Sequence, residues 1–105
     1  MGQPQPTPEQ LKQMADKQAE PLLAQLKSNP SDPQLLAQLG NLYYDAQQFN
    51  AAISYYDRAL KLQPSNAGVR TDMATAYWYL GDPDKAIAEF NNSLSQMIRR
   101  VKALK

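Results

Sequence analysis

Apolar residues recur every three or four positions along most of the chain, the spacing that places them on one face of an α-helix. The pattern breaks at short polar or proline-containing stretches. It predicts helices over residues 8–28, 33–46, 49–62, 66–80 and from 83 onward. No segment alternates apolar and polar residues in the manner of a half-buried strand. The sequence therefore predicts an all-α protein of five helices.

Residues that start and stop helices stand at these boundaries. A capping box begins at Thr7, with proline at the first helical position, and Asp32 and Asp82 each precede a proline in the same way. Gly81 is placed to end the fourth helix in the left-handed conformation. Pro21 interrupts the first helical segment, so we expect a kink or a break just before it.

The chain repeats itself with a period of 34 residues, the distance from Tyr43 to Tyr77. The same shift aligns four further apolar pairs, which are Ala52 with Ala86, Ile53 with Ile87, Tyr56 with Phe90, and Leu60 with Leu94. Matches at this one period indicate two successive copies of a pair of helices.

The spacing of these residues resembles the tetratricopeptide repeat (TPR), which places small and large side chains at fixed positions of a helix hairpin. The first copy carries the resemblance at Leu36, Leu39, Gly40, Tyr43, Ala52, Tyr56, Ala59 and Pro64. The second copy departs from the family pattern at Arg70, where tryptophan is common, and at Ile98, where a proline usually closes the repeat. Small Gly40 and its counterpart Ala74 would let paired helices approach closely, so we interpret them as core positions.

The resemblance implies antiparallel helix hairpins stacked as a short right-handed solenoid. Residues 33–66 and 67–98 would form two full repeats, and residues 8–28 an N-terminal half-repeat or capping helix. Residues 1–7 would be a disordered tail rich in proline and glutamine, and residues 99–105 a basic extension of the last helix.

The resemblance also implies a concave groove, lined by the first helix of each hairpin, in which TPR proteins bind extended peptides or partner helices. The groove residues of this sequence would be Gln38, Asn41, Tyr44, Asp45, Thr71, Asp72, Thr75, Trp78 and Tyr79. Amide side chains bind a peptide backbone, and aromatic side chains offer broad apolar anchors. Trp78 and Tyr44 have an alternative interpretation, in which they pack against the first helix or cover an open end of the stack.

The last helix carries a heptad-like series of apolar residues that steps by three and four, from Ile87 to Leu104. We expect Ile87, Phe90 and Leu94 to face the preceding helices. The later residues have no predicted partner within the chain, and an open apolar face is normally covered. We therefore expect a homo-oligomer formed through Phe90, Leu94, Met97, Ile98, Val101 and Leu104. The alternative is that the helix ends near Ser95 and the tail frays.

Composition narrows the classes of function. The chain has a formal net charge of +1 and contains neither Cys nor His, which removes thiol nucleophiles, imidazole bases and the usual zinc ligands. Carboxylates such as Asp84 are explained by helix capping, and no motif of a phosphate loop or a metal site is present, so we expect no enzyme and no cofactor. We also expect a soluble chain, because no targeting segment and no apolar run of about 20 residues is present.

Four bases, Arg99, Arg100, Lys102 and Lys105, lie in the last seven positions. We interpret them as complementing the helix dipole and expect no nucleic-acid partner and no membrane insertion. Two hypotheses follow from the whole sequence. The chain is a scaffold that binds a protein or peptide in its groove, or a structural module that associates with itself through the last helix.

Overall fold

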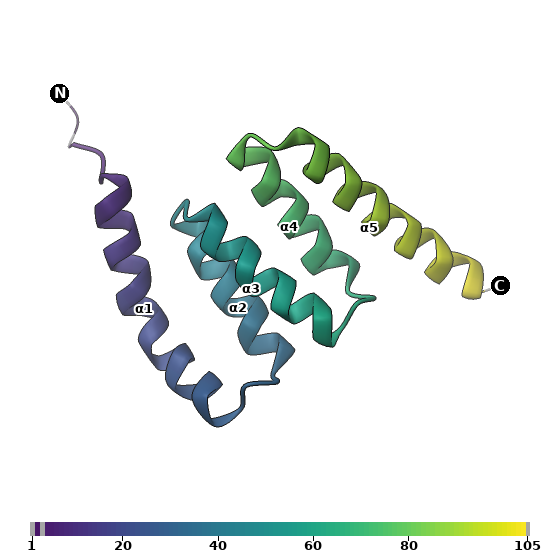
Figure 1. Cartoon of the computed structure of the whole chain (residues 1–105), viewed down its shortest axis with the longest axis horizontal. Helices are drawn as coiled ribbons and strands as arrows, with labels where there is room; N and C mark the ends of the chain where they lie inside the picture. Colours follow the sequence, from purple (N-terminus) through teal and green to yellow (C-terminus); the bar gives the residue numbers. More distant parts are fainter. Residues whose placement is uncertain (1, 3, 105) are drawn as a thin grey trace.

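The computed structural model describes residues 2 and 4–104 and consists of helices joined by short turns (Figure 1). The helices are α1 (Pro8–Ser28), α2 (Pro33–Asp45), α3 (Phe49–Leu62), α4 (Ala67–Leu80) and α5 (Pro83–Ala103). Each helix packs against the next one along the chain, so the stack runs in sequence order from α1 to α5. No strand occurs among the described residues, and the predicted all-α architecture is confirmed. The predictions for Met1, Gln3 and Lys105, in the tail and the basic extension, lie outside the described residues.

Side-chain caps fix where the helices begin. Thr7 forms the predicted capping box with Gln10, and the side chains of Asp32, Asn66 and Asp82 each accept a hydrogen bond from a backbone N–H of the helix that follows. These bonds satisfy N–H groups that have no partner within the helix. α3 is different, because Gln48 precedes it without a side-chain cap.

The ends of α2 and α4 both use left-handed backbone. Gly81 follows α4 with a φ of 84°, as predicted. In the turn between α2 and α3 the corresponding conformation belongs to Gln47, with a φ of 61°. Residues other than glycine are uncommon at positive φ, and the sequence did not predict a positive φ at Gln47.

Pro21 does not break α1. The helix is continuous from Pro8 to Ser28, so of the two predicted alternatives, a kink or a break, the break is wrong. Ala15 and Ala19 are buried before the proline and Leu26 is buried after it, so one apolar face on both sides of Pro21 packs against the rest of the stack. That packing opposes the local preference of proline against a helix interior.

The crossing of α2 and α3 depends on Gly40. A Cβ atom at this position would lie 2.5 Å from two ring carbons of Tyr56, which is itself buried. The hydroxyl of Tyr56 donates a hydrogen bond to Oδ1 of Asn41 at 2.7 Å. Glycine therefore gives the Tyr56 ring the room it needs at the point where the two helices meet.

α1 is joined to α2 by a polar contact beside the apolar one. The hydroxyl of Tyr43 donates to Oδ1 of Asp16 at 2.7 Å, and the ammonium of Lys12 pairs with the other carboxylate oxygen at 2.9 Å. The hydrogen bonds from Tyr43 and Lys12 hold the pKa of Asp16 below its ordinary value.

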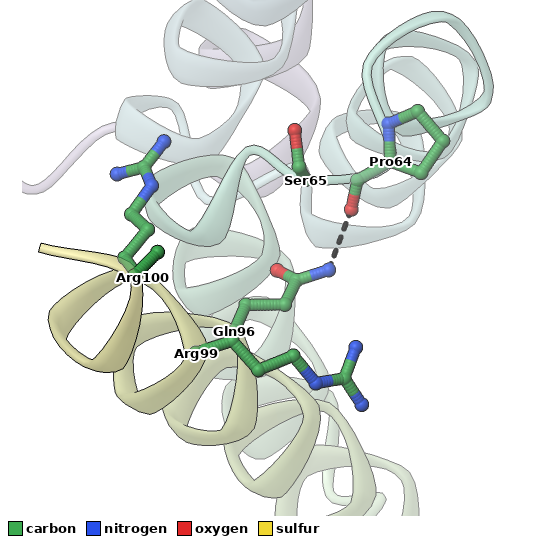
Figure 2. A pocket seen from close by; sticks show the side chains of 6 residues that line it. Pro64, Ser65, Gln96, Arg99 and Arg100 are labelled. Atoms are coloured by element: carbon green, nitrogen blue, oxygen red, sulfur yellow. Dashed lines mark hydrogen bonds between the residues drawn. The ribbon is translucent and has the colours of Figure 1, made fainter.

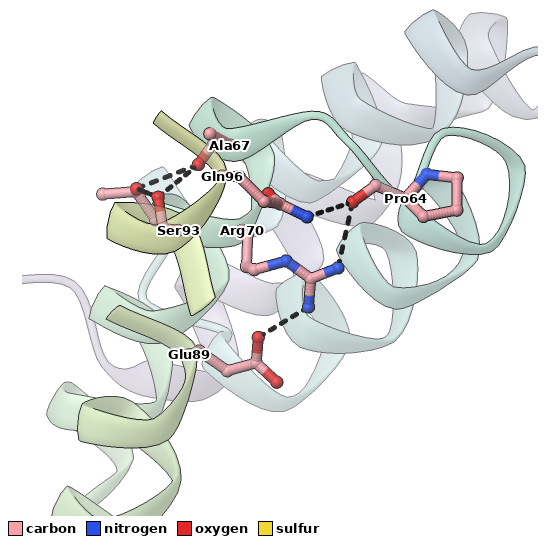
Figure 3. Close-up of polar contacts among 7 residues, drawn as sticks. Pro64, Ala67, Arg70, Glu89, Ser93 and Gln96 are labelled. Carbon is pink, nitrogen blue, oxygen red and sulfur yellow. Dashed lines mark hydrogen bonds and ion pairs between the residues drawn. The ribbon is translucent and has the colours of Figure 1, made fainter. Parts of the chain in front are cut away.

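α5 packs against α4 through small and polar side chains. Ala86 and Ser93 are buried, and Oγ of Ser93 donates to the carbonyl of Ala67 at 2.9 Å (Figure 3). The guanidinium of Arg70 pairs with Glu89 at 2.9 Å, so the residue at the tryptophan position of the repeat holds the two helices together.

A second polar contact ties the C-terminal half of α5 to the turn before α4. The carbonyl of Pro64 accepts hydrogen bonds from Nε2 of Gln96 at 2.6 Å and from the guanidinium of Arg70 at 3.1 Å (Figure 3). α5 is helical to Ala103, and the alternative in which it ends near Ser95 is wrong.

The apolar residues of α5 do not face the preceding helices. Ile87, Phe90 and Leu94 are exposed, and the expectation that they pack inside the second repeat is wrong. The reason is the register that Ala86, Glu89, Ser93 and Gln96 impose, because these residues lie three or four positions apart and turn their own face toward α4 and the Pro64 turn.

Candidate interaction surfaces

An aromatic cluster joins α2, the start of α3 and the end of α4. The rings of Tyr44 and Tyr79 meet edge to face with centroids 6.2 Å apart, and Phe49 stacks on Tyr79 at 5.2 Å. Phe49 also lies 5.4 Å from Tyr44. The sequence analysis did not include Phe49 among the groove residues, although the sequence shows that an aromatic residue begins the third helix. Two predicted groove residues from different repeats, Tyr44 and Tyr79, thus lie together.

Two acidic residues of the predicted groove affect the pKa of Tyr44. Burial raises the pKa of Tyr44 above its ordinary value, and the nearby charges of Tyr79, Asp72 and Asp45 raise it further. Asp72 is exposed as a residue, yet neighbouring protein atoms exclude enough water from its carboxylate to raise its pKa. These two carboxylates come from different helices, Asp45 from α2 and Asp72 from α4.

The polar side chains of the predicted groove divide into two groups. Gln38 and Asn41 lie on the exposed face of α2, and the bond from Tyr56 orients the Asn41 amide. Thr71 and Thr75 do not present their hydroxyl groups in the same way. Oγ1 of Thr71 donates to the carbonyl of Ala67 at 2.9 Å, and Oγ1 of Thr75 donates to the carbonyl of Thr71 at 3.0 Å.

Among the predicted groove residues, Thr71 also contacts α5. Its hydroxyl lies 2.5 Å from the hydroxyl of Ser93 on α5, so the side chain belongs to the contact between α4 and α5. The helical projection missed this because Thr71 stands at the border of the groove face and the face turned to α5.

Trp78 extends from the end of α4 with 58% of its surface exposed. It is therefore no core residue. Tyr44 is half-buried against Phe49 and Tyr79, so its packing partners come from α3 and α4, whereas the sequence-based alternative placed them in the first helix.

The second surface is an apolar face on α5 that we call the α5 seam, formed by Ile87, Phe90, Leu94, Ile98 and Val101. The exposed fractions of these side chains range from 38% for Phe90 to 60% for Val101. Met97 borders the seam with 43% exposed, and Leu104 follows the helix at its C-cap. Five large apolar side chains along one face form a patch of the kind that marks interaction sites.

The equivalent residues of the first repeat show what such a face does when it is covered. Phe90 corresponds to Tyr56 and Leu94 to Leu60, at a shift of 34 residues. Tyr56 is 1% exposed and Leu60 5%, because Tyr56 packs against Gly40 and Asn41 of α2 and both residues belong to the core cluster that includes Val69 and Met73 of α4. The α5 seam thus leaves exposed two positions whose counterparts in the first repeat are buried.

A hollow of about 460 Å³ lies between the Pro64 turn and the last turns of α5, lined by Pro64, Ser65, Gln96, Arg99, Arg100 and Ala103. Figure 2 shows that the guanidinium groups of Arg99 and Arg100 point to opposite sides of this hollow. The two bases therefore do not converge on one anion.

Comparison with known proteins identifies the architecture. The family model of the tetratricopeptide repeat matches residues 33–66, and a second model of the same repeat matches residues 67–96. The chain belongs to the tetratricopeptide-repeat family. TPR domains are in general non-enzymatic interaction modules, and the chain is accordingly a protein-interaction scaffold.

The relatives agree on the fold. The inactive TPR repeat-containing thioredoxin TTL3 of Arabidopsis thaliana is 36% identical over 61 residues, which is 58% of this chain and 9% of that protein. Two solved structures of MamA superpose with TM-scores of 0.77 and 0.78 at 24% and 21% identity, covering 84% and 90% of this chain. This TPR chain spans about a tenth of the curated relative and 51% and 57% of those two structures.

The part of the TPR chain that the structure describes contains no helix of the length and apolar character needed to cross a membrane. Within the same residues, no group of three or more His, Cys, Asp or Glu side chains is arranged to hold a metal ion.

Proposed function

We propose that this TPR chain is a non-enzymatic scaffold that docks a helix of a protein partner on the α5 seam. The observation that carries the proposal is the contrast between the two repeats. Leu60 is 5% exposed in the core cluster that includes Val69 and Met73 of α4, whereas its counterpart Leu94 has 55% of its surface exposed. Apolar area removed from water contributes roughly 25 cal/mol per Å², so the seam offers a driving force for docking.

The chemistry of the partner follows from the helix that covers α3. α4 contributes buried Val69 and Met73 to the same core cluster as Tyr56 and Leu60. A partner for the α5 seam would present the same type of surface, an amphipathic helix with apolar residues three or four positions apart.

A peptide of residues 67–80, the sequence of α4, is a suitable probe. In excess over the full chain, it should shift the amide resonances of residues along the outer face of α5. Leu94→Asp should abolish these shifts, because it places a charge in the middle of the seam. Asn92→Asp adds the same charge on the opposite side of the helix and should preserve them. Failure of the peptide to shift any residue of the seam would contradict the proposal.

The aromatic and acidic surface between α2 and α4 supports a second function, the binding of an extended peptide in the concave groove. The observation in its favour is that the rings of Tyr44 and Tyr79, from different repeats, meet edge to face, while Asp45 and Asp72 lie on the same two helices as these rings. An acidic surface with aromatic side chains favours a peptide that carries lysine or arginine.

A short lysine-containing peptide tests the groove. Its binding should weaken in Asp72→Asn and in Trp78→Ala, each measured with helicity as a check on folding. Asp57→Asn is the matched control, because Asp57 is an acidic residue of α3 that pairs with Lys61. Equal loss of binding in Asp72→Asn and Asp57→Asn would show only a general effect of charge and would exclude the groove.

A further inference from the structure

The residues of the α5 seam are arranged symmetrically along the helix. They lie at positions 87, 90, 94, 98 and 101, so the steps between them are 3, 4, 4 and 3. The series therefore reads the same in both directions from Leu94. Two copies of α5 laid antiparallel, with Leu94 facing Leu94, bring each apolar residue opposite another one. Ile87 then faces Val101, and Phe90 faces Ile98.

The charges of α5 have a polarity that suits the same arrangement. In the N-terminal half of the helix Asp84 and Glu89, with Asp82 at the N-cap, outnumber the single base Lys85, whereas Arg99, Arg100 and Lys102 lie in the C-terminal half. An antiparallel pair brings the acidic half of one helix beside the basic half of the other. It also aligns the two helix dipoles in the favourable, opposed direction.

One pair of charged residues falls at the border of the seam. Asp84 and Lys102 lie ten residues before and eight residues after Leu94, and at 100° per residue both project about 80° to the same side of it. In the antiparallel pair, Asp84 of one copy and Lys102 of the other are about 3 Å apart along the common axis. The two-fold symmetry forms this contact twice.

We infer that the partner of the α5 seam is a second copy of this chain, docked antiparallel with Leu94 on the two-fold axis and flanked by two Asp84–Lys102 ion pairs. The inference rests on the proposed docking function of the seam and names its occupant. Polar contacts hold α5 from Glu89, Ser93 and Gln96 on the side turned to α4 and the Pro64 turn, so the seam is presented on a different side of the helix.

Self-association is measured first on the full chain by sedimentation. The wild-type chain should form a dimer, Leu94→Asp should be a monomer, and Asn92→Asp should remain a dimer. A wild-type monomer at high micromolar concentration overturns the second copy as the occupant. If the peptide of residues 67–80 still binds the seam of such a monomer, the docking function stands and the inference alone fails.

Disulfide trapping determines the relative orientation of the two α5 helices. Because the sequence contains no Cys, only the introduced cysteines can form a disulfide. Ile87 and Val101 lie about 21 Å apart along one helix. In the antiparallel pair, Ile87→Cys in one chain should cross-link to Val101→Cys in another, because a disulfide needs Cα atoms within about 7 Å. Oxidation of the mixture should therefore give the linked dimer, and oxidation of either variant alone should not. Linkage within a single variant would show a parallel pair and overturn the inference.

Charge exchange gives an independent test. Asp84→Lys or Lys102→Glu alone should raise the dissociation constant on the order of threefold to tenfold, since each places like charges at both borders of the seam. The double variant should restore the wild-type value. A double variant that is weaker than both single variants would show that these residues do not meet across the two-fold axis.

Discussion

Tyr56 contacts α2 through both ends of its side chain. The ring occupies the volume left by the missing side chain of Gly40, and the hydroxyl is bound to the next residue, Asn41. Burial raises the pKa of Tyr56, so the hydroxyl stays protonated and remains a donor at neutral pH. One aromatic residue thereby fixes both the distance and the register between the two helices.

Gly40→Ala should destabilise the chain even though alanine is the better helix former. The added methyl group would lie 2.5 Å from the Tyr56 ring, and overpacking of this kind costs about 1–3 kcal/mol. Gly68→Ala is the matched control, because its Cβ would meet only the side chain of Asn66, at 3.4 Å. The free energy of unfolding in urea should fall for Gly40→Ala and rise slightly for Gly68→Ala. Equal values would disprove the role of the crossing.

Tyr43→Phe should reduce the sensitivity of the fold to acid. The pKa of Asp16 is lower in the folded chain than its ordinary value, so its contribution to stability is present above that value and is lost as the pH falls through the folded pKa. Removing the Tyr43 hydroxyl removes the first cause of the shift, the hydrogen bond to the Asp16 carboxylate. The urea midpoint of the wild type should therefore fall more steeply between about pH 5 and pH 2 than that of Tyr43→Phe. Parallel curves would contradict this account.

At the level of elements, α1 and α5 show where packing overrides local sequence. α1 continues through Pro21 because buried residues on both sides of it share one face. α5 turns its large apolar residues outward because buried Ala86 and Ser93 let it approach α4 closely. In both helices the decisive contacts are with another element.

Pro21→Ala should therefore stabilise the chain. Proline in a helix interior loses a backbone hydrogen bond and costs up to about 3 kcal/mol relative to alanine, and Pro21 is exposed, so no packing is lost on replacement. Thermal unfolding should show an increased midpoint, whereas Glu20→Ala, an exposed change on the same turn, should have little effect. An unchanged midpoint for Pro21→Ala would indicate that α1 unfolds before the rest of the stack.

The sequence predicted the elements better than their contacts. Helix limits could be predicted because capping residues, prolines and Gly81 act locally. The face that α5 turns to α4 could not, since the hydrophobic period favoured Phe90 and Leu94, whereas an ion pair and the Ser93 hydroxyl determine the packing. The contact between Thr71 and Ser93 could not be predicted for the same reason. The role of Phe49 could not be predicted, because the residues it contacts, Tyr44 and Tyr79, come from two other helices.

In the molecule as a whole, the buried apolar core is distributed unevenly along the stack of helices. Its extents are 54 × 38 × 21 Å, and the core cluster gathers on α1, α2, α3 and the adjoining side of α4. On α5 the buried residues are only Ala86 and Ser93. The last helix therefore contributes little apolar burial of its own, and docking on the seam would add the most to its stability.

The thermal midpoint should accordingly depend on protein concentration. A fold that is stabilised by association gains stability by mass action, so the midpoint of the wild type should rise as the chain is concentrated. Leu94→Asp should have a midpoint that does not change with concentration. A constant midpoint for the wild type would argue against any association that stabilises the folded chain.

The contact among Gly40, Asn41 and Tyr56 also bears on how the repeats can be exchanged. In the second repeat the same three positions hold Ala74, Thr75 and Phe90 (a shift of 34 residues). Phe90 has no hydroxyl that could donate a hydrogen bond to an amide oxygen, and the hydroxyl of Thr75 donates to a backbone carbonyl of its own helix. The three positions thus change as a set. A chimera that exchanges single helices between repeats must therefore carry all three residues together. Otherwise the tyrosine hydroxyl loses its hydrogen-bond acceptor, and the methyl group of alanine clashes with the tyrosine ring.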